Sequence, residues 1–239
     1  MQRSMSSAAP LELFVETLWI SPYTFSSFVA LKEKGLEFEV TEVSLLRLEN
    51  RAAGYRDASV TAKVPALRHD GFWVAESSAI AEYLDEAFPA PAHPALLPAA
   101  RRDRARARQL MAWLRSDLGA LRDERPTTTM FYDRATKPLS AAGEEDAAKL
   151  LRVAASVVPS TAGPLFGAWA LVDSELAFML QRLLLNGHAV PEPVRAYAEA
   201  QWQRASVREF VQHARPAALP EEYWALPWNV GSAAAPPSR

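Results

Sequence analysis

Residues Trp19 to Gly35, WISPYTFSSFVALKEKG, decide how the first part of the chain folds. Before them, Leu11 to Ile20 is a short apolar run that predicts a buried strand. Ser21-Pro22 has the pattern of a helix start, and Gly35 has the pattern of a helix end. The Ser21 hydroxyl is therefore predicted to lie at the positive end of a helix. It is either a plain structural cap or a group that faces a ligand.

The composition is that of an ordinary globular protein. The chain has 239 residues, of which 49% are apolar and 23% charged, so one or two domains are expected. A net charge of -2 gives no bulk attraction to nucleic acid or to an anionic membrane, and no apolar run reaches the length of about 18 residues that spans a bilayer. We expect neither kind of partner. The polar start of the chain lacks the apolar segment of a secretory signal, so residues 1–9 are predicted to be a disordered leader.

The chain contains no cysteine, which limits its chemistry. It excludes disulfides, thiolate metal sites and a thiol supplied by the protein, and it is compatible with the cytoplasm. The four histidines show no metal-ligand spacing, so no metal is expected. Any sulfur chemistry must therefore use a sulfur carried by a small molecule.

The segment after the first helix continues an α/β pattern. Phe38 to Leu45 alternates as a second strand, which predicts a strand-helix-strand unit with a parallel pair. Residues 46–63 are irregular, with one weak helical turn. Strands over Val64 to His69 and Phe72 to Ala75 are joined by a tight Asp70-Gly71 turn. A helix follows from Ser77 or Ser78.

The second part of the chain reads as helical throughout. Residues 10–90 form the predicted α/β domain, 91–100 a proline-rich linker, 101–216 an all-helical domain, and 217–239 an aromatic tail with a disordered end. The predicted helices share an amphipathic or apolar pattern and cover residues 101–126, 140–158, 173–185 and 193–214, with a loop over 127–139.

Two further fragments carry chemistry. At Val64-Pro65 the proline opens a strand, which fits either an edge position or a cis peptide that leaves the Val64 main chain free for a ligand. Glu76-Ser77 places a carboxylate and a hydroxyl at a helix start. Such a pair either binds a zwitterion or simply caps the helix and complements its dipole.

Taken together and in this order, the fragments resemble the glutathione S-transferase superfamily. Its fold is a thioredoxin-like α/β N-terminal domain followed by an all-α helical C-terminal domain. The chain is most similar to the bacterial YfcF-like glutathione transferases, through the stretches ESSAIAEYL, RARARQLMAWLRSDLGALRDERPT and QWQRASV.

The resemblance implies a set of glutathione-binding residues. Ser21 matches the catalytic serine that hydrogen-bonds the glutathione sulfur, and Val64-Pro65 matches the cis-proline step whose main chain pairs with the cysteinyl segment. Glu76 and Ser77 match the pair that holds the γ-glutamyl group, and Lys63 is a candidate for the glycyl carboxylate. Glutathione is then a cosubstrate.

The resemblance also implies an activity. We expect a cytoplasmic, homodimeric glutathione transferase acting in detoxification or oxidative stress, which directs the glutathione thiol at an electrophile, a peroxide or a disulfide. The alternatives are a glutathione-dependent disulfide reductase or peroxidase with weak conjugating activity, and a non-catalytic binding module. Trp113 and Arg115 are the candidates for the electrophile site.

Two further features lie in the helical part. Arg108, Arg115 and Arg122 recur every seven residues, which favours a solvated or dimer-facing stripe over ligand contacts. The superfamily usually has Ser or Thr as the cap of a helix three residues before an Asp. This chain has Ala170 before Asp173, so we expect another group, Asp173 itself among them, to satisfy the helix N–H groups.

Overall fold

The computed structural model describes residues 11–225. Its first part contains one four-stranded mixed sheet with helices between and after the strands. The strands are β1 (Leu11–Glu16), β2 (Phe38–Val43), β3 (Ala66–His69) and β4 (Phe72–Ala75). Their order is β2-β1-β3-β4, with β1 and β2 parallel and the other two pairs antiparallel. The predicted parallel pair and the hairpin are confirmed.

Helices cover both faces of the sheet. On one face, Leu13 and Val15 of β1 pack with the helices α1 (Pro22–Glu33) and α3 (Ser77–Ala87). On the other face, Phe14 stacks on Trp73 at 4.4 Å and meets Tyr55 of α2 (Ala53–Ser59) edge-on. Successive residues of a strand point to opposite faces, so burial of all six residues of β1 requires this cover on both sides.

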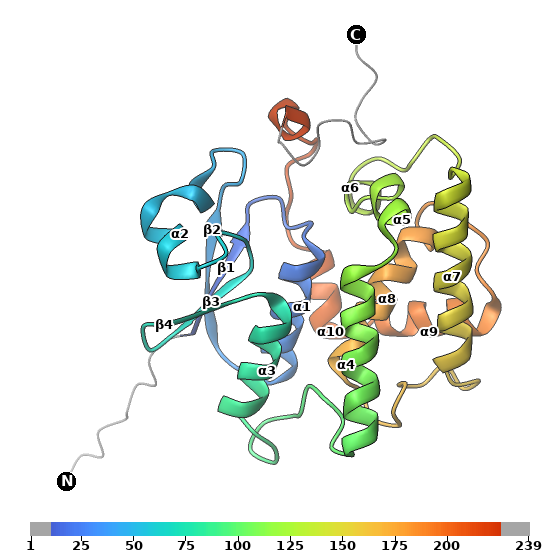
Figure 1. The fold of residues 1–239 in the computed structure, drawn as a ribbon, viewed down its shortest axis with the longest axis horizontal. Helices are drawn as coiled ribbons and strands as arrows, with labels where there is room; N and C mark the ends of the chain where they lie inside the picture. The colour runs from blue at the N-terminus through green and yellow to red at the C-terminus, as the bar shows by residue number, and fades with distance from the viewer. Residues whose placement is uncertain (1–10, 226–239) are drawn as a thin grey trace.

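The rest of the described chain is helical. The α-helices share the second part of the molecule and are α4 (Arg101–Ser116), α5 (Gly119–Glu124), α6 (Thr128–Phe131), α7 (Ala141–Val157), α8 (Leu171–Leu184), α9 (Glu192–Trp202) and α10 (Ala205–Val211). Two short 3-10 helices are η1 (Glu49–Arg51) and η2 (Glu221–Ala225). All but the last residue of α8 are buried, as its apolar sequence predicts. Figure 1 shows the sheet on one side, α1 and α3 in the middle, and the helical part on the other side.

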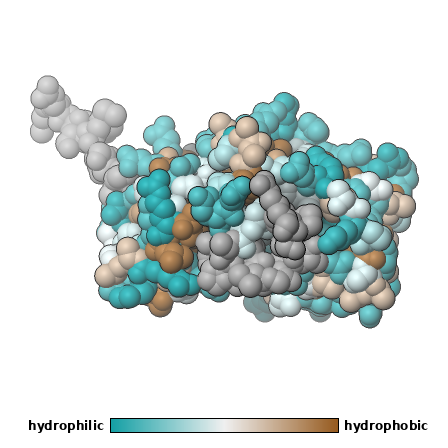
Figure 2. All heavy atoms as spheres, turned by 90° about the horizontal axis from the view of Figure 1, so that it is seen from above, coloured by the Kyte–Doolittle hydropathy of each residue, from teal (hydrophilic) through white to brown (hydrophobic). Residues whose placement is uncertain are grey.

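The two parts share one hydrophobic core. Phe25 of α1 lies 4.5 Å from Phe178 of α8 and 5.3 Å from Phe210 of α10, measured between ring centroids. Figure 2 shows that the surface seen from above is mostly hydrophilic, with hydrophobic residues in small groups. The predicted domain boundaries stay a prediction, because this core joins the two parts.

Several predicted elements are wrong in extent. The first strand ends at Glu16 rather than Ile20, residues 46–63 contain α2, and the loop over 127–139 contains α6. The expected helix over 101–126 breaks at Leu118, whose φ is 61°. The Asp117 carboxylate accepts the Leu118 N–H at 2.7 Å there and replaces a helical partner.

The last predicted helix, 193–214, is also two helices. The break between α9 and α10 places Arg204 and Ser206 on Glu33 of α1, with an Arg204–Glu33 ion pair at 2.6 Å. The expected disordered leader and the end of the tail lie outside the described residues.

Another group replaces the missing side-chain cap at the start of α8, as expected, and it is a main-chain carbonyl. Ala170 is its N-cap and has no side-chain acceptor. The N–H of Leu171 is bound by the carbonyl of Leu96 at 2.8 Å, not by Asp173. The fully buried Asp173 carboxylate instead accepts the N–H groups of Ala170 and Leu165, both at 2.9 Å.

Candidate functional site

The strand register brings the three chemistry-bearing fragments to one end of the sheet. Phe14 of β1 is paired with Ala66 of β3, which is paired with Ala75 of β4. Beyond this row lie the segment that leads from β1 to Ser21, the Val64-Pro65 step before β3, and Glu76 after β4. Ser21 therefore lies at the same end of the sheet as Val64 and Glu76, which follow it 43 and 55 positions later in the chain.

Ser21 is both a helix cap and a free donor. Its half-buried side chain accepts the main-chain N–H groups of Tyr23 and Thr24, each at 3.2 Å. A hydroxyl also has one proton to donate. No acceptor for that proton lies within residues 11–225. The Ser21 hydroxyl can therefore keep its structural role and still hydrogen-bond a ligand at the positive end of α1.

A buried carboxylate holds Ser21 in place. Glu16, which is 4% exposed, accepts the N–H of Ile20 at 2.5 Å and that of Ser21 at 2.7 Å with one oxygen. Its other oxygen accepts the Thr24 hydroxyl at 2.7 Å. Burial raises the pKa of Glu16, and the hydrogen bonds from Ser21 and Thr24 oppose that rise.

Residues near the end of the described chain also bind the segment before Ser21. Trp19 has a φ of 52°, and its carbonyl accepts the Arg215 side chain at 2.7 Å and 3.1 Å. The indole donates to Glu42 at 2.8 Å and stacks on His213 with ring centroids 3.6 Å apart. The position of Ser21 is thus fixed by residues from both ends of the chain.

The Val64-Pro65 peptide is cis. The preceding segment is anchored by Tyr55, which donates its hydroxyl to the Lys63 carbonyl at 2.7 Å, and by Asn50, which donates to the Ala62 carbonyl at 2.8 Å. Within residues 11–225 the Val64 main chain has no hydrogen-bond partner. It is available to pair with an extended ligand, and the exposed Lys63 side chain lies beside it.

Glu76 and Ser77 mark the start of α3. Glu76 is exposed and has a φ of 68°, and it makes no side-chain cap. The first N–H groups of α3 have no partner within the helix and point to the same end. Ser77 is 3% exposed, and its hydroxyl lies 3.3 Å from the nearest guanidinium nitrogen of Arg115.

Arg115 of α4 is the centre of a polar cluster beside this site that includes residues of α1, α3 and α8. Its guanidinium makes two hydrogen bonds of 2.6 Å to the carboxylate of Glu175 on α8. Ser26 of α1 donates to the same carboxylate at 2.6 Å, and Ser77 of α3 touches the guanidinium. Burial lowers the pKa of Arg115, but the charge and hydrogen bonds of Glu175 outweigh this and leave the pKa raised.

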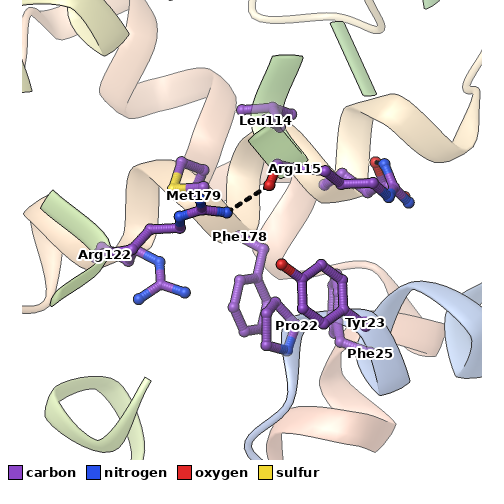
Figure 3. A pocket seen from close by; sticks show the side chains of 10 residues that line it. Pro22, Tyr23, Phe25, Leu114, Arg115, Arg122, Phe178 and Met179 are labelled. Atoms are coloured by element: carbon purple, nitrogen blue, oxygen red, sulfur yellow. Dashed lines mark hydrogen bonds and ion pairs between the residues drawn. The ribbon is translucent and has the colours of Figure 1, made fainter. Parts of the chain in front are cut away.

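A pocket lies next to the start of α1, where it is lined by the two residues that follow Ser21. Its volume is about 390 Å³, counting the space open to solvent at its mouth. Pro22, Tyr23 and Phe25 of α1 contribute to its lining, and α4, α5 and α8 supply the rest. Figure 3 shows Tyr23 on one side and Arg122 and Met179 on the other, with Phe178 between them. The pocket is thus placed where a second substrate could meet a ligand held by Ser21.

The structure brings Arg115 but not Trp113 to this pocket. Trp113 instead packs against a core cluster within the helical part that includes Leu150 and Leu180, and its indole donates to Asp117 at 2.8 Å. The favoured interpretation of Arg108, Arg115 and Arg122 as a solvated or dimer-facing stripe is wrong for Arg115, which is bound to the buried Glu175. Arg108 pairs with Glu82 of α3, whereas Arg115 and Arg122 line the pocket.

Arg182 is a pocket residue that the sequence did not indicate. It lies in the most apolar helix and is 3% exposed, yet it lines the pocket beside Arg122. A lone arginine in an apolar helix was the available signal, since buried charges are rare without a partner. Among residues 11–225, no group of three or more potential metal ligands is gathered, and no helix has the length and apolarity to cross a bilayer.

Comparison with known proteins settles the family. The model of the glutathione S-transferase N-terminal domain matches residues 20–87, and that of the C-terminal domain matches residues 100–215. A glutathione transferase homologue from Burkholderia gl BGR1, solved with bound glutathione, is 40% identical and aligns over 85% of this chain and 97% of that chain, with a TM-score of 0.69. The chain belongs to the glutathione S-transferase superfamily. The predicted superfamily and the predicted fold class are therefore confirmed.

Other relatives of the superfamily match over shorter stretches or at lower identity. A probable glutathione S-transferase from rice is 42% identical over 89 residues, which is 37% of its length and 37% of this chain. The chain thus spans just over a third of that curated relative. A rice glutathione S-transferase solved with glutathione is 26% identical over 94% of this chain and 96% of that chain, with a TM-score of 0.66. A β-etherase from Sphingobium, 21% identical over 85% of this chain and 99% of that chain with a TM-score of 0.63, shows only the same fold. The YfcF-like placement stays a prediction.

Proposed function

We propose that this glutathione S-transferase superfamily member is a glutathione transferase that binds glutathione, activates its thiol and directs the thiolate at an electrophile. The observation that carries the proposal is the Ser21 hydroxyl, which caps α1 yet keeps a proton to donate. Its pocket-side neighbours Pro22 and Tyr23 link this donor to the space for a second substrate.

The ends of glutathione match the groups at the end of the sheet. Glu76 would take the γ-glutamyl ammonium, and the α3 N-terminus with Ser77 its carboxylate. The unpaired main chain of Val64 at Pro65 would hold the cysteinyl segment as an added strand, and Lys63 the glycyl carboxylate. Arg115, which is paired with Glu175, contacts the Ser77 hydroxyl and would hold it in place beside the γ-glutamyl carboxylate.

Ser21 would then lower the thiol pKa. A hydroxyl that donates to a thiolate, at the positive end of α1, favours the ionised form over a thiol whose ordinary pKa is about 8.5. The thiolate forms a bond to the electrophilic carbon while the leaving group departs with its bonding electrons. Serine does not become covalently attached, which is consistent with a chain that has no cysteine.

The finer features of the expected activity belong to the same proposal. We place the enzyme in the cytoplasm as a homodimer that acts in detoxification or oxidative stress, with no nucleic-acid or membrane partner. Peroxide and disulfide reduction remain alternatives in which glutathione supplies every thiol.

Parallel assays of an aryl halide, a hydroperoxide and a disulfide, each with glutathione, test this function. We expect the aryl halide to be conjugated and the rate to fall in Ser21→Ala and in Glu76→Ala. Turnover confined to the peroxide or the disulfide would assign the alternative activity. Equal turnover in the wild type and both variants would contradict the site.

A further inference from the structure

The pocket beside Ser21 has an excess of positive charge. Three of its lining residues are arginines and one is a glutamate. Both oxygens of that glutamate, Glu175, are bound by Arg115 at 2.6 Å. Within residues 11–225, Arg122 and Arg182 therefore have no carboxylate partner.

Arg182 is the unusual member of the pair. It is 3% exposed, and one of its terminal nitrogens donates to the Arg125 carbonyl at 2.6 Å. Its Nε is buried and has no partner in the described chain. Buried charges are normally paired, since removing an unpaired charge from water is unfavourable. Burial, and then the nearby Arg122, lower the pKa of Arg182 to about 10, so it is still charged at neutral pH.

Arg122 of α5 lines the same pocket close to Arg182. One of its nitrogens donates to the Arg115 carbonyl at 2.7 Å, drawn as a dashed line in Figure 3. This bond fixes the direction of the half-buried side chain and leaves the rest of the guanidinium without an acceptor in residues 11–225. A planar guanidinium matches the two oxygens of a carboxylate.

The remaining wall of the pocket is apolar. Phe25, Leu114, Phe178 and Met179 contribute to it, and Tyr23 adds an aromatic ring at the mouth. A pocket with this lining and two unpaired cations suits a molecule with an apolar body and one anionic group. A neutral hydrophobic electrophile would leave both arginines without a partner.

We infer that the second substrate is a carboxylate-bearing electrophile with an aromatic or other apolar body, whose carboxylate is held by Arg122 and Arg182. Its reactive carbon would lie toward Ser21 at the end of the pocket formed by Pro22 and Tyr23. The reaction in this inference rests on the proposed function, but binding of the carboxylate does not. Arg182 also links α8 to α5 through the Arg125 carbonyl, so Arg122 is the cleaner site for a substitution.

A pair of aryl halides that differ in one charge tests the inference. The probes are para-chloro-meta-nitrobenzoate and its methyl ester. In both, the glutathione thiolate forms a bond to the ring carbon and chloride leaves with the bonding electrons. Comparing each variant with the wild type on the same probe removes the difference in intrinsic reactivity between the two.

We expect Arg122→Gln to raise KM for the benzoate by at least about tenfold, because a charge-assisted hydrogen bond is lost, and to change KM for the ester by less than about twofold. Arg122→Lys keeps the charge and should restore part of the affinity for the benzoate. Arg152→Gln, an exposed arginine on α7, is the matched control and should leave both KM values unchanged. Equal effects of Arg122→Gln on the two probes would overturn the inference.

Calorimetry with unreactive probes separates this inference from the proposed function. Meta-nitrobenzoate and its methyl ester are titrated into the wild type and Arg122→Gln, with and without glutathione. Loss of benzoate binding with unchanged glutathione binding supports the inference even if no turnover is found. If the variant instead loses glutathione, the arginine serves the glycyl carboxylate, and the inference fails while the proposed function stands. If the wild type binds the benzoate but not glutathione, the proposed function fails alone.

Discussion

The carboxylate of Glu16 accepts the main-chain N–H of Ser21 at 2.7 Å. The same carboxylate binds the N–H of Ile20 and the Thr24 hydroxyl, so it fixes the segment that carries the proposed thiolate partner. Glu16 is the last residue of β1 and is almost fully buried. It positions Ser21 through the backbone and leaves the Ser21 hydroxyl free to act.

Stability should depend on pH through Glu16. Burial raises its pKa in the folded protein above the ordinary value of 4.5. A group with a raised folded pKa contributes stability that is fully present below 4.5 and is lost as the pH rises through the folded pKa. Glu16→Gln cannot titrate. The free energy of unfolding of the wild type, minus that of the variant, should therefore fall as the pH rises from 4.5 and then level off. Urea unfolding at a series of pH values measures both free energies. If the wild-type value minus the variant value grew with pH, the hydrogen bonds to the Glu16 carboxylate would outweigh the effect of burial on its pKa.

Ser21→Ala should separate the two roles of this serine. Loss of the cap on α1 should cost about 1 kcal/mol of stability. Loss of the donor to the thiolate should lower kcat/KM by about tenfold to a hundredfold, the usual range for a hydrogen bond to a charged group.

Ser140→Ala provides the matched control for this variant. Ser140 caps α7 by accepting the N–H of Gly143 at 3.2 Å, as Ser21 caps α1. The Ser140 hydroxyl also donates to Glu124 at 2.5 Å, so we expect a loss of stability at least as large, with unchanged turnover. If both variants lost activity in proportion to their stability, Ser21 would be a cap and nothing more.

Glu76→Gln should weaken glutathione binding by about tenfold to a hundredfold, because the charged partner of the γ-glutamyl ammonium is lost. Calorimetric titration with glutathione measures the change. Glu86→Gln, at an exposed position on the same helix, keeps the overall charge of the variants equal and should bind like the wild type. Equal affinity of the two variants would remove Glu76 from the site.

Asp173 and Tyr197 should be strongly coupled in stability. The Tyr197 hydroxyl donates to the fully buried Asp173 at 2.9 Å. Asp173→Ala leaves this donor and two N–H groups without an acceptor and should cost about 3 kcal/mol or more, whereas Tyr197→Phe should cost about 1 to 2 kcal/mol. Urea unfolding of both single variants and the double variant gives the coupling. Additive effects would mean that the hydrogen bond contributes nothing.

Local sequence patterns predicted the parts of the fold that local chemistry determines. Ser21-Pro22 specifies a helix start, Asp70-Gly71 a hairpin, and the apolar run of α8 a buried helix. The roles of Glu16 and Arg182 could not be predicted in this way. Glu16 looks like one residue of a strand, and its partners become visible only when the chain turns back toward it.

The pocket could not be predicted from the sequence for a related reason. Arg115, Arg122 and Arg182 come from three helices that face one another only in the folded chain. The break at Leu118 redirects α5, so the regular spacing of Arg115 and Arg122 did not indicate their common pocket. The pairing of Arg115 with Glu175, 60 positions away, is likewise a long-range contact that no local pattern contains.

The most direct test of the central claim is a pH titration of the ultraviolet absorbance of the thiolate of bound glutathione, in the wild type and in Ser21→Ala. We predict that the wild type lowers the thiol pKa below its ordinary value of about 8.5, and that the variant binds glutathione but returns the pKa toward that value. The same lowered pKa in both proteins would contradict the assignment of Ser21 as the thiolate partner.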